Sequence, residues 1–321
     1  MTRSWEEFEE RAKRGTLVPV VRELSADTLT PVTAFLRLRS EDEPAFLFES
    51  VEGGERIGRY SFIGTRPFRT VSVVGDAVTI DTANGERTTR RGNFFSILED
   101  ELRPYRSAPA PELPPLTAGA VGWIGYDAVR FIERIPDRHP RDTSLPDAEL
   151  RFYDSLVAFD HAKHRLFLIA NAHVASGDGE ADLRAAYDRA TTELDRLHSR
   201  LVEPAAGESR IRLFDVLPPG PTIATGMTSD FTPADFEAAV ARAREHIFAG
   251  DIFQVVLSQR FRKDVSVDPF EVYRCLRALN PSPYLFFIQR PDTALLGSSP
   301  EIMVRVEKRV AMVRPIAGTR R

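Results

Sequence analysis

The fold class is decided by residues 45–80, AFLFESVEGGERIGRYSFIGTRPFRTVSVVGDAVTI. This stretch holds four short runs rich in aromatic and β-branched residues, which strands favour. The runs are AFLFESV (45–51), RYSFIG (59–64), RTVSVV (69–74) and AVTI (77–80). Gly53 and Gly54 separate the first two runs, and such glycine pairs mark turns. The stretch therefore predicts a series of short strands joined by turns.

Helix signals flank these runs. Ser4 and Glu7 form a capping box at the start of the chain, and Gly15 ends the helix that they predict. A second helix is expected after Thr30, with Pro31 in its first turn. Further helices are predicted near residues 94–102, over 180–201, from Thr232 to Gly250 with a buried stripe of Phe236, Val240, Ala243 and Ile247, and from Asp268 to Asn280.

Further strands are predicted between and after these helices. They cover GAVGWIGY, SLVAFD, RLFLIANA and DIFQVVLSQRF, and residues 284–289, 294–296, 302–307 and 310–316. Helices and strands are mixed without strict β-α-β alternation. The pattern therefore favours an α+β fold with mixed, largely antiparallel sheets packed with helices.

Length and composition bound the class of protein. The chain has 321 residues, 43 basic and 47 acidic side chains and one cysteine, Cys275. A net charge of −4 gives no general attraction for nucleic acid, and no stretch is long and apolar enough to predict a membrane span. One cysteine excludes an internal disulfide and a cysteine-based metal cluster. We expect a soluble, cytoplasmic enzyme.

The length favours two domains. Residues 203–226 are rich in proline and glycine, so the predicted division is an N-terminal region (1–202), a linker (203–226) and a further domain (227–321). Residues 103–116, also rich in proline, are expected to form an exposed connector. The last residues directly follow a predicted strand, and the expectation is that the second domain is incomplete.

At three places in the chain, the residue types alone suggest a binding or catalytic role. Glu49 and Ser50 end an apolar strand with a carboxylate and a hydroxyl, which can bind an amino group; a strand reaching its polar turn is the alternative. Glu301 heads an apolar strand, where suppressed ionisation would suit a general acid, or where it simply caps the strand. Gly318 and Thr319 can bind a carboxylate or form an ordinary turn.

Five segments in this order resemble a known family. They are FLFESVEGGERIGRYSFIG (46–64), AGAVGWIGYDAVR (118–130), GDIFQVVLSQRF (250–261), NPSPYLFF (280–287) with GSSPE (297–301), and RPIAGTRR (314–321). Together they resemble the component I subunits of anthranilate synthases, within the chorismate-utilising enzymes. The resemblance implies the sandwich fold of chorismate-binding enzymes with a C-terminal part missing. It also implies conversion of chorismate and ammonia to anthranilate and pyruvate, the first committed step of tryptophan biosynthesis.

The resemblance also assigns residues to sites. It implies a feedback pocket for L-tryptophan, in which Ser50, Pro283, Tyr284 and Leu285 are contacts and Glu49 and Arg59 lie nearby. It assigns Gly318, Thr319 and the neighbouring Ala317 to chorismate, and Glu301 to protonation of the departing ring hydroxyl.

Two positions distinguish relatives within the family. Gln254 stands where water-using relatives have a lysine base, and ammonia needs no such base because it carries its own lone pair. Ala317 stands where aminodeoxychorismate synthases have a lysine nucleophile, which disfavours that enzyme. Aminodeoxychorismate synthase component I and an inactive tryptophan-binding fragment remain the alternatives.

The family also implies groups beyond these residues. Mg²⁺ is the expected cofactor, and the acidic clusters that hold it follow the PIAGT motif in relatives, so no metal ligand is assigned in this chain. Ammonia is expected from a glutamine amidotransferase subunit, component II, in a hetero-oligomer. Because those later segments are absent, we expect the chain alone to be inactive.

Overall fold

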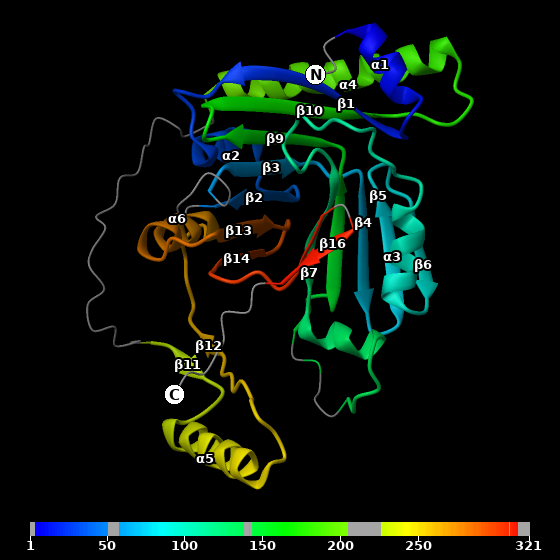
Figure 1. Cartoon of the computed structure of the whole chain (residues 1–321). Helices are drawn as coiled ribbons and strands as arrows, with labels where there is room; N and C mark the ends of the chain where they lie inside the picture. The colour runs from blue at the N-terminus through cyan, green and yellow to red at the C-terminus, as the bar shows by residue number, and fades with distance from the viewer. Residues whose placement is uncertain are drawn as a thin grey trace. The chain divides into compact units, whose positions relative to one another are not determined.

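The computed structural model describes residues 4–50, 58–137, 141, 143–204, 226–307 and 309–313. The described strands pair in antiparallel sheets with helices packed against them, which confirms the α+β prediction (Figure 1). Two large sheets, of seven and five strands, carry most of the strands. The remaining pairs are short and two-stranded.

The seven-stranded sheet has the order β1-β10-β9-β3-β2-β13-β14. Its strands are β1 (Leu17–Ser25), β2 (Ala45–Glu49), β3 (Tyr60–Thr65), β9 (Ser155–Asp160), β10 (Arg165–His173), β13 (Tyr284–Gln289) and β14 (Ala294–Ser299). Sequence reasoning predicted all of these except β1. The sheet joins strands from the two ends of the chain, because β13 pairs with β2.

The five-stranded sheet has the order β6-β5-β4-β8-β7. Its strands are β4 (Arg69–Val74), β5 (Ala77–Thr82), β6 (Arg87–Arg91), β7 (Gly119–Ile124) and β8 (Ala148–Tyr153). Helix α3 (Phe94–Leu102), capped by Asn93, packs Phe94, Ile97 and Leu98 into the core of this sheet. A short 3₁₀ helix, η1 (Tyr126–Phe131), follows β7.

A second core lies between the two large sheets. Phe46 of β2, Val121 of β7, Tyr153 of β8, Leu156 of β9 and Ile288 of β13 are all buried and form one apolar cluster. Each residue comes from a different strand, so burial of these side chains ties the two sheets together.

The helix signals near the N-terminus are confirmed. Ser4 caps α1 (Trp5–Ala12), and Thr30 caps α2 (Pro31–Leu38), each by accepting a hydrogen bond from the third following amide. Helix α4 (Glu180–Val202) packs along β10 and β1 through Ala186, Ala190, Leu194, Leu197 and Leu201, which are buried. Their spacing of three and four residues places them on one face of the helix.

The chain divides into two compact units, Met1–Leu213 with Leu276–Arg321, and Phe214–Cys275. This grouping differs from the division expected from the sequence, because β13 and β14 complete the sheet of the first unit instead of starting a separate domain. The linker at 203–226 stays a prediction, since residues 205–225 lie outside the described part of the chain.

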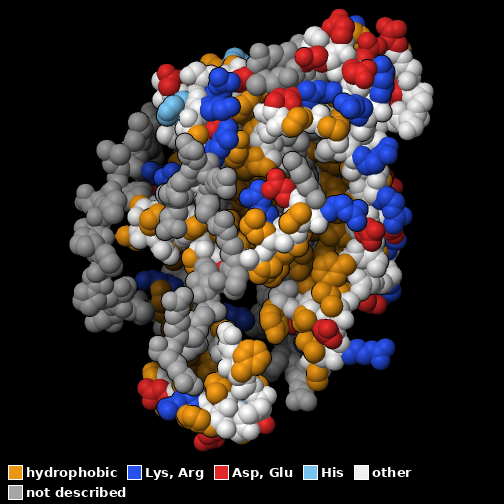
Figure 2. Space-filling view, in the orientation of Figure 1, with side chains coloured by type: hydrophobic (Ala, Val, Ile, Leu, Met, Phe, Trp, Pro, Cys, Tyr) orange, Lys and Arg blue, Asp and Glu red, His pale blue; other side chains and the backbone are white. Residues whose placement is uncertain are grey.

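In the smaller unit, two predictions are wrong. Helix α5 (Pro233–Ala249) begins at its Thr232 cap and ends at Gly250, but none of its residues is buried: Val240 and Ile247 are exposed. The predicted strand over DIFQVVLSQRF is reduced to β12 (Phe261–Arg262), which pairs with β11 (Thr228–Ser229). Figure 2 shows hydrophobic side chains on the surface of this unit. Among the residues described for this unit, the apolar side chains of α5 have the spacing of a buried stripe but remain outside a core.

Of the remaining predicted segments, two strands and the connector 103–116 differ from expectation. Helix α6 (Pro269–Leu279) is as expected, but strands β15 (Arg305–Glu307) and β16 (Val310–Met312) are shorter than predicted. The connector 103–116 is not simply exposed: Ala108 and Leu113 are buried, and Ser107 forms a bridge with Leu17 of β1. Apolar residues in a proline-rich segment therefore cover the edge of the sheet here.

Candidate functional site

The pairing of β2 with β13 brings the residues of the predicted effector site together. Leu285 lies opposite Glu49 in the register, although 236 positions of sequence separate them. Ser50 follows Glu49 directly at the end of β2, and Pro283 and Tyr284 lie at the start of β13. These strands are adjacent in Figure 1.

Glu49 is a buried carboxylate with a defined partner. Its side chain is 2% exposed, and Arg277 in the last turn of α6 donates Nε to Oε2 at 2.9 Å and Nη2 to Oε1 at 3.2 Å. Such a two-point contact matches the planar guanidinium to the carboxylate and compensates for its burial. The guanidinium itself is 39% exposed, so it lies between the buried acid and solvent.

A second arginine–carboxylate pair lies at the same end of the sheet. Arg59 donates Nε and Nη2 to the two carboxylate oxygens of Asp160 at 3.1 and 2.7 Å. Burial by itself raises the pKa of the Asp160 carboxyl, but the hydrogen bond and charge of Arg59 outweigh burial and hold that pKa below its ordinary value.

A histidine completes the polar cluster. His161 follows Asp160, and its Nε2 is 2.7 Å from Oγ of the buried Ser61. Desolvation lowers the pKa of the imidazole, against the raising effect of Glu49 and Asp160. The imidazole thus lies beside two carboxylates, Glu49 and Asp160, each paired with an arginine.

Ser50 has an unsatisfied hydroxyl. Its Oγ is buried and makes no hydrogen bond with any residue in the described part of the chain. A buried polar atom without a hydrogen-bond partner destabilises the folded state, so such atoms commonly bind a ligand or a water molecule. Next to it, Leu285 is buried, whereas Pro283 and Tyr284 are partly accessible. The arrangement offers an ammonium site beside an aromatic and aliphatic wall.

The surroundings of the predicted catalytic residues differ from expectation or lie outside the described structure. Glu301 is exposed between β14 and β15, and Met303 beside it is 86% exposed, so the apolar surroundings expected for Glu301 are not found. The strand begins only at Arg305, which explains the difference. Gln254 is exposed in irregular chain of the smaller unit. Ala317, Gly318 and Thr319 lie outside the described residues.

Sequence reasoning missed the partners of the effector site. Arg277, Asp160, Ser61 and His161 come from α6, β9, β3 and the turn after β9. No local signal marks them, because each contact joins residues about 100 to 228 positions apart. The alternation of buried positions on β3 could have suggested that Ser61, which is fully buried, requires a partner.

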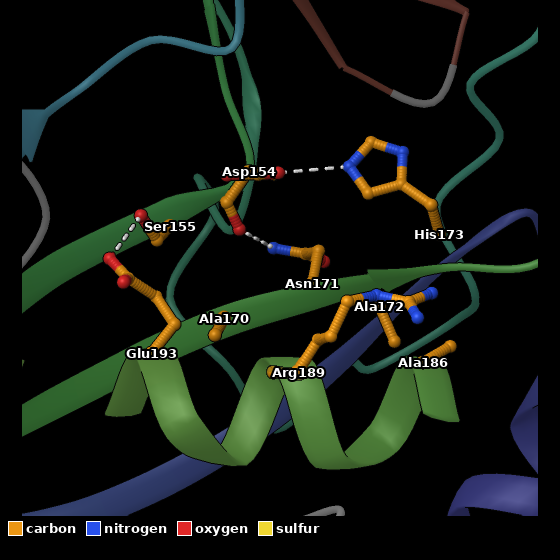
Figure 3. A pocket seen from close by; sticks show the side chains of 10 residues that line it. Asp154, Ser155, Ala170, Asn171, Ala172, His173, Ala186, Arg189 and Glu193 are labelled. Carbon is orange, nitrogen blue, oxygen red and sulfur yellow. Dashed lines mark hydrogen bonds and ion pairs between the residues drawn. The ribbon is translucent and has the colours of Figure 1, made fainter. Parts of the chain in front are cut away.

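A separate hollow of about 160 Å³ lies between α4 and strands β9 and β10 (Figure 3). Its polar side chains contact one another: Asp154 binds His173 at 2.9 Å, and Ser155 donates to Glu193 at 3.1 Å. The residues predicted from the sequence do not line it. This hollow is therefore separate from the predicted effector residues of β2 and β13.

Among the residues that the structure describes, no group of three or more His, Cys, Asp or Glu side chains is arranged to hold a metal ion. None of the described helices combines the length and the apolar character that crossing a membrane requires.

Comparisons with known proteins identify the family of the chain. Residues 43–321 match the family model described as chorismate binding enzyme. The chain is 36% identical to anthranilate synthase component 1 of Acetivibrio thermocellus and 38% identical to that of Synechocystis sp.. These matches cover 97% and 98% of the chain but 61% and 62% of the relatives, so the chain spans about three fifths of their length.

A solved structure shares the fold. The crystal structure of anthranilate synthase component I from Streptococcus pneumoniae TIGR4 superposes with a TM-score of 0.64 at 28% identity. The match covers 90% of this chain and 59% of that one. The similarity thus extends over most of this chain.

Proposed function

The chain belongs to the family of chorismate-binding enzymes, and from this premise we propose that it is a component I of anthranilate synthase. The reaction is the conversion of chorismate and ammonia to anthranilate and pyruvate, which commits chorismate to tryptophan biosynthesis. L-Tryptophan is the proposed feedback inhibitor, bound at the end of β2 and β13. The enzyme acts as a lyase on a carbon–oxygen bond.

The observation that supports this proposal most directly is the juxtaposition of Glu49 and Ser50 with β13. A free amino acid presents an ammonium group, and a buried carboxylate beside an unsatisfied hydroxyl suits that group. Tyr284 and Leu285 offer an apolar wall for an indole ring. The 36–38% identity to anthranilate synthase components 1 supports the choice of reaction.

In the proposed chemistry, this chain contributes residues that bind the ring and move a proton. Gly318 and Thr319 bind a carboxylate of chorismate through a backbone amide and a hydroxyl, and Ala317 leaves room beside the ring. Glu301 donates a proton to the ring hydroxyl as it departs. Gln254 carries no charge and accepts no proton, in accord with a nucleophile that needs no base.

Two components come from outside the described residues. Mg²⁺ would neutralise negative charge on chorismate when bound. No residue of the described part is assigned to the ion, since no suitable cluster occurs there. A glutamine amidotransferase subunit, component II, is the proposed source of ammonia and implies a hetero-oligomer in the cytoplasm.

Product analysis tests the proposal and its alternatives. Because the chain alone is expected to be inactive, it is assayed both alone and fused to the C-terminal part of the Synechocystis relative. Each protein is incubated with chorismate, ammonium and Mg²⁺, and anthranilate is followed by its fluorescence. Anthranilate from the fusion supports the proposal. Aminodeoxychorismate in place of anthranilate would support the related component I enzyme. Neither product, together with binding of L-tryptophan, would indicate a tryptophan-binding fragment without turnover.

Replacing Ser50 by alanine is expected to weaken binding of L-tryptophan by about one to two orders of magnitude. The change removes one hydrogen bond in a desolvated site, worth about 1–3 kcal/mol. Tyr284→Ala, which removes an aromatic wall, should act in the same direction. Calorimetric titration gives the affinity. Ser96→Ala on the exposed face of α3 is the control, and equal affinities of Ser50→Ala and this control would contradict the pocket assignment.

Replacing Ala317 by lysine tests the proposed attack by ammonia. In the completed enzyme, the longer side chain should occupy the space beside the ring, so we expect a strong loss of anthranilate formation or a covalent adduct that intact-mass analysis detects. Overpacking alone costs about 1–3 kcal/mol of stability, so the melting temperature is measured alongside. Normal turnover and chorismate affinity in Ala317→Lys would show that this residue does not face the ring.

A further inference from the structure

One edge of the Arg277 guanidinium is not used in the contact with Glu49 and remains available for a ligand. Arg277 uses Nε and Nη2 to hold Glu49, and its Nη1 makes no hydrogen bond within the described part of the chain. Nη1 carries two N–H donors, and the guanidinium is 39% exposed. The pair therefore presents a buried acid and an accessible cation side by side.

We propose that Arg277 binds the α-carboxylate of the amino-acid effector while Glu49 and Ser50 bind its ammonium group. This inference rests on the effector site under Proposed function and assigns it a second charged contact. The pair Glu49–Arg277 has no net charge, and a free α-amino acid also has none. When the ammonium group of the ligand lies against Glu49 and its carboxylate lies against Arg277, opposite charges meet at both contacts. No ion is then left buried and unpaired.

The position of Arg277 suits this role. It lies in the last turn of α6, where a cation is favoured by the helix dipole, and three residues before Asn280. The carbonyl of Asn280 accepts a 2.6 Å hydrogen bond from Ser298 of β14, so the connection from Arg277 to Pro283 is held against the sheet. A cation on a held segment loses less freedom when it binds a carboxylate.

Arg59 is less suited to the same task. It also makes a two-point contact with a buried acid, Asp160, but its guanidinium lies 4.8 Å from the centroid of the Tyr60 ring. Stacking on the ring and pairing with Asp160 occupy both a face and an edge of the group. Arg277 has no such ring contact among the described residues.

The test compares two ligands that differ in one group. L-Tryptophan has the carboxylate and tryptamine lacks it, whereas both have the ammonium and the indole. For the full chain, tryptophan should bind more tightly than tryptamine. In Arg277→Met the ratio of tryptophan affinity to tryptamine affinity should fall about 10- to 100-fold, because the variant loses one charged hydrogen bond to the carboxylate. Tryptamine should bind as well as before or better, because Glu49 loses its competing cation.

Two further variants keep the test decisive. Arg277→Lys retains a cation beside Glu49 but lacks the planar guanidinium, which holds Glu49 through one edge and offers Nη1 to the ligand. The ratio should therefore fall here too, even where Arg277→Met does not fold. Arg196→Met on α4, which breaks a comparable two-point contact with Glu193 far along the chain, should leave the ratio unchanged.

The outcomes separate the inference from the proposal beneath it. An unchanged ratio in Arg277→Met and Arg277→Lys, with tryptophan still bound, would overturn the role of Arg277 and leave the effector site standing. Failure of the unsubstituted chain to bind either ligand would overturn the effector site itself. Loss of affinity for both ligands in equal measure would show that Arg277 only supports the structure.

Discussion

Replacing Glu149 by alanine is expected to lower the free energy of unfolding by about 3–5 kcal/mol, because it leaves a buried arginine without its anion. Glu149 and Arg151 of β8 are 5% and 4% exposed and form an ion pair. The second oxygen of Glu149 binds Nη1 of Arg290 at 2.8 Å. Arg151 also donates to the carbonyl of Gln289 at 2.5 Å.

This network joins the two large sheets. Glu149 and Arg151 lie in the five-stranded sheet, whereas Gln289 ends β13 of the seven-stranded sheet. The side chain of Gln289 in turn donates to the carbonyls of Ser40 and Glu43 at 2.6 and 2.8 Å. Loss of Glu149 therefore also weakens the anchoring of β13, which carries Tyr284 and Leu285.

Urea denaturation followed by circular dichroism measures the effect. Asp76→Ala is the control, because Asp76 and its partner Arg91 are 65% and 74% exposed, and exposed pairs contribute little. A midpoint shift in Glu149→Ala no larger than that of Asp76→Ala would contradict the assignment of this network as a buried anchor between the sheets.

Replacing Gly122 by alanine should prevent correct pairing of β7 with β8 and destabilise the fold by at least about 3 kcal/mol. A Cβ at position 122 would lie 1.8 Å from the carbonyl oxygen of Glu149 and 3.0 Å from Cα of Leu150. Both are backbone atoms in the partner strand, so no side-chain rotation relieves the clash. The strands would have to separate.

The yield of soluble protein and the melting temperature measure this effect. Gly179→Ala is the matched control: Gly179 precedes α4 at a negative φ of −78°, and the nearest atom to a Cβ there is a side-chain oxygen of Asp182 at 3.8 Å. Only a small loss is expected for it. If Gly122→Ala melts within a few degrees of Gly179→Ala, the close approach of β7 and β8 is wrong.

Local signals account for the parts of the fold that the sequence predicted. The caps at Ser4, Thr30 and Thr232 begin helices because a side-chain oxygen there satisfies an amide of the first turn. Short apolar runs became β2, β3, β4 and β5 because their residues fit a half-buried strand. The strand missed at β1, LVPVVRELS, contains Pro19, a residue that argues against a strand by local rules.

The wrong predictions in the smaller unit arise because local signals do not specify which partner a segment pairs or packs with. The run DIFQVVLSQRF has the composition of a strand, yet a strand requires a neighbour, and in the described structure only Phe261 and Arg262 have one. The stripe on α5 likewise has helical spacing without an apolar surface to cover it. Composition predicts what a segment can form, whereas pairing decides what it does form.

By itself, the sequence determined the α+β class and most helix boundaries, because caps and alternation act over a few neighbouring residues. The motifs gave the family resemblance, and that resemblance grouped Glu49, Ser50, Pro283, Tyr284 and Leu285 as one predicted site. Only the tertiary structure decided that Arg277 holds Glu49, that Arg59 holds Asp160, and that the seven-stranded sheet draws β13 to β2. The physical reason is that these contacts depend on which surfaces of distant strands and helices are buried together, and local sequence carries no record of that choice.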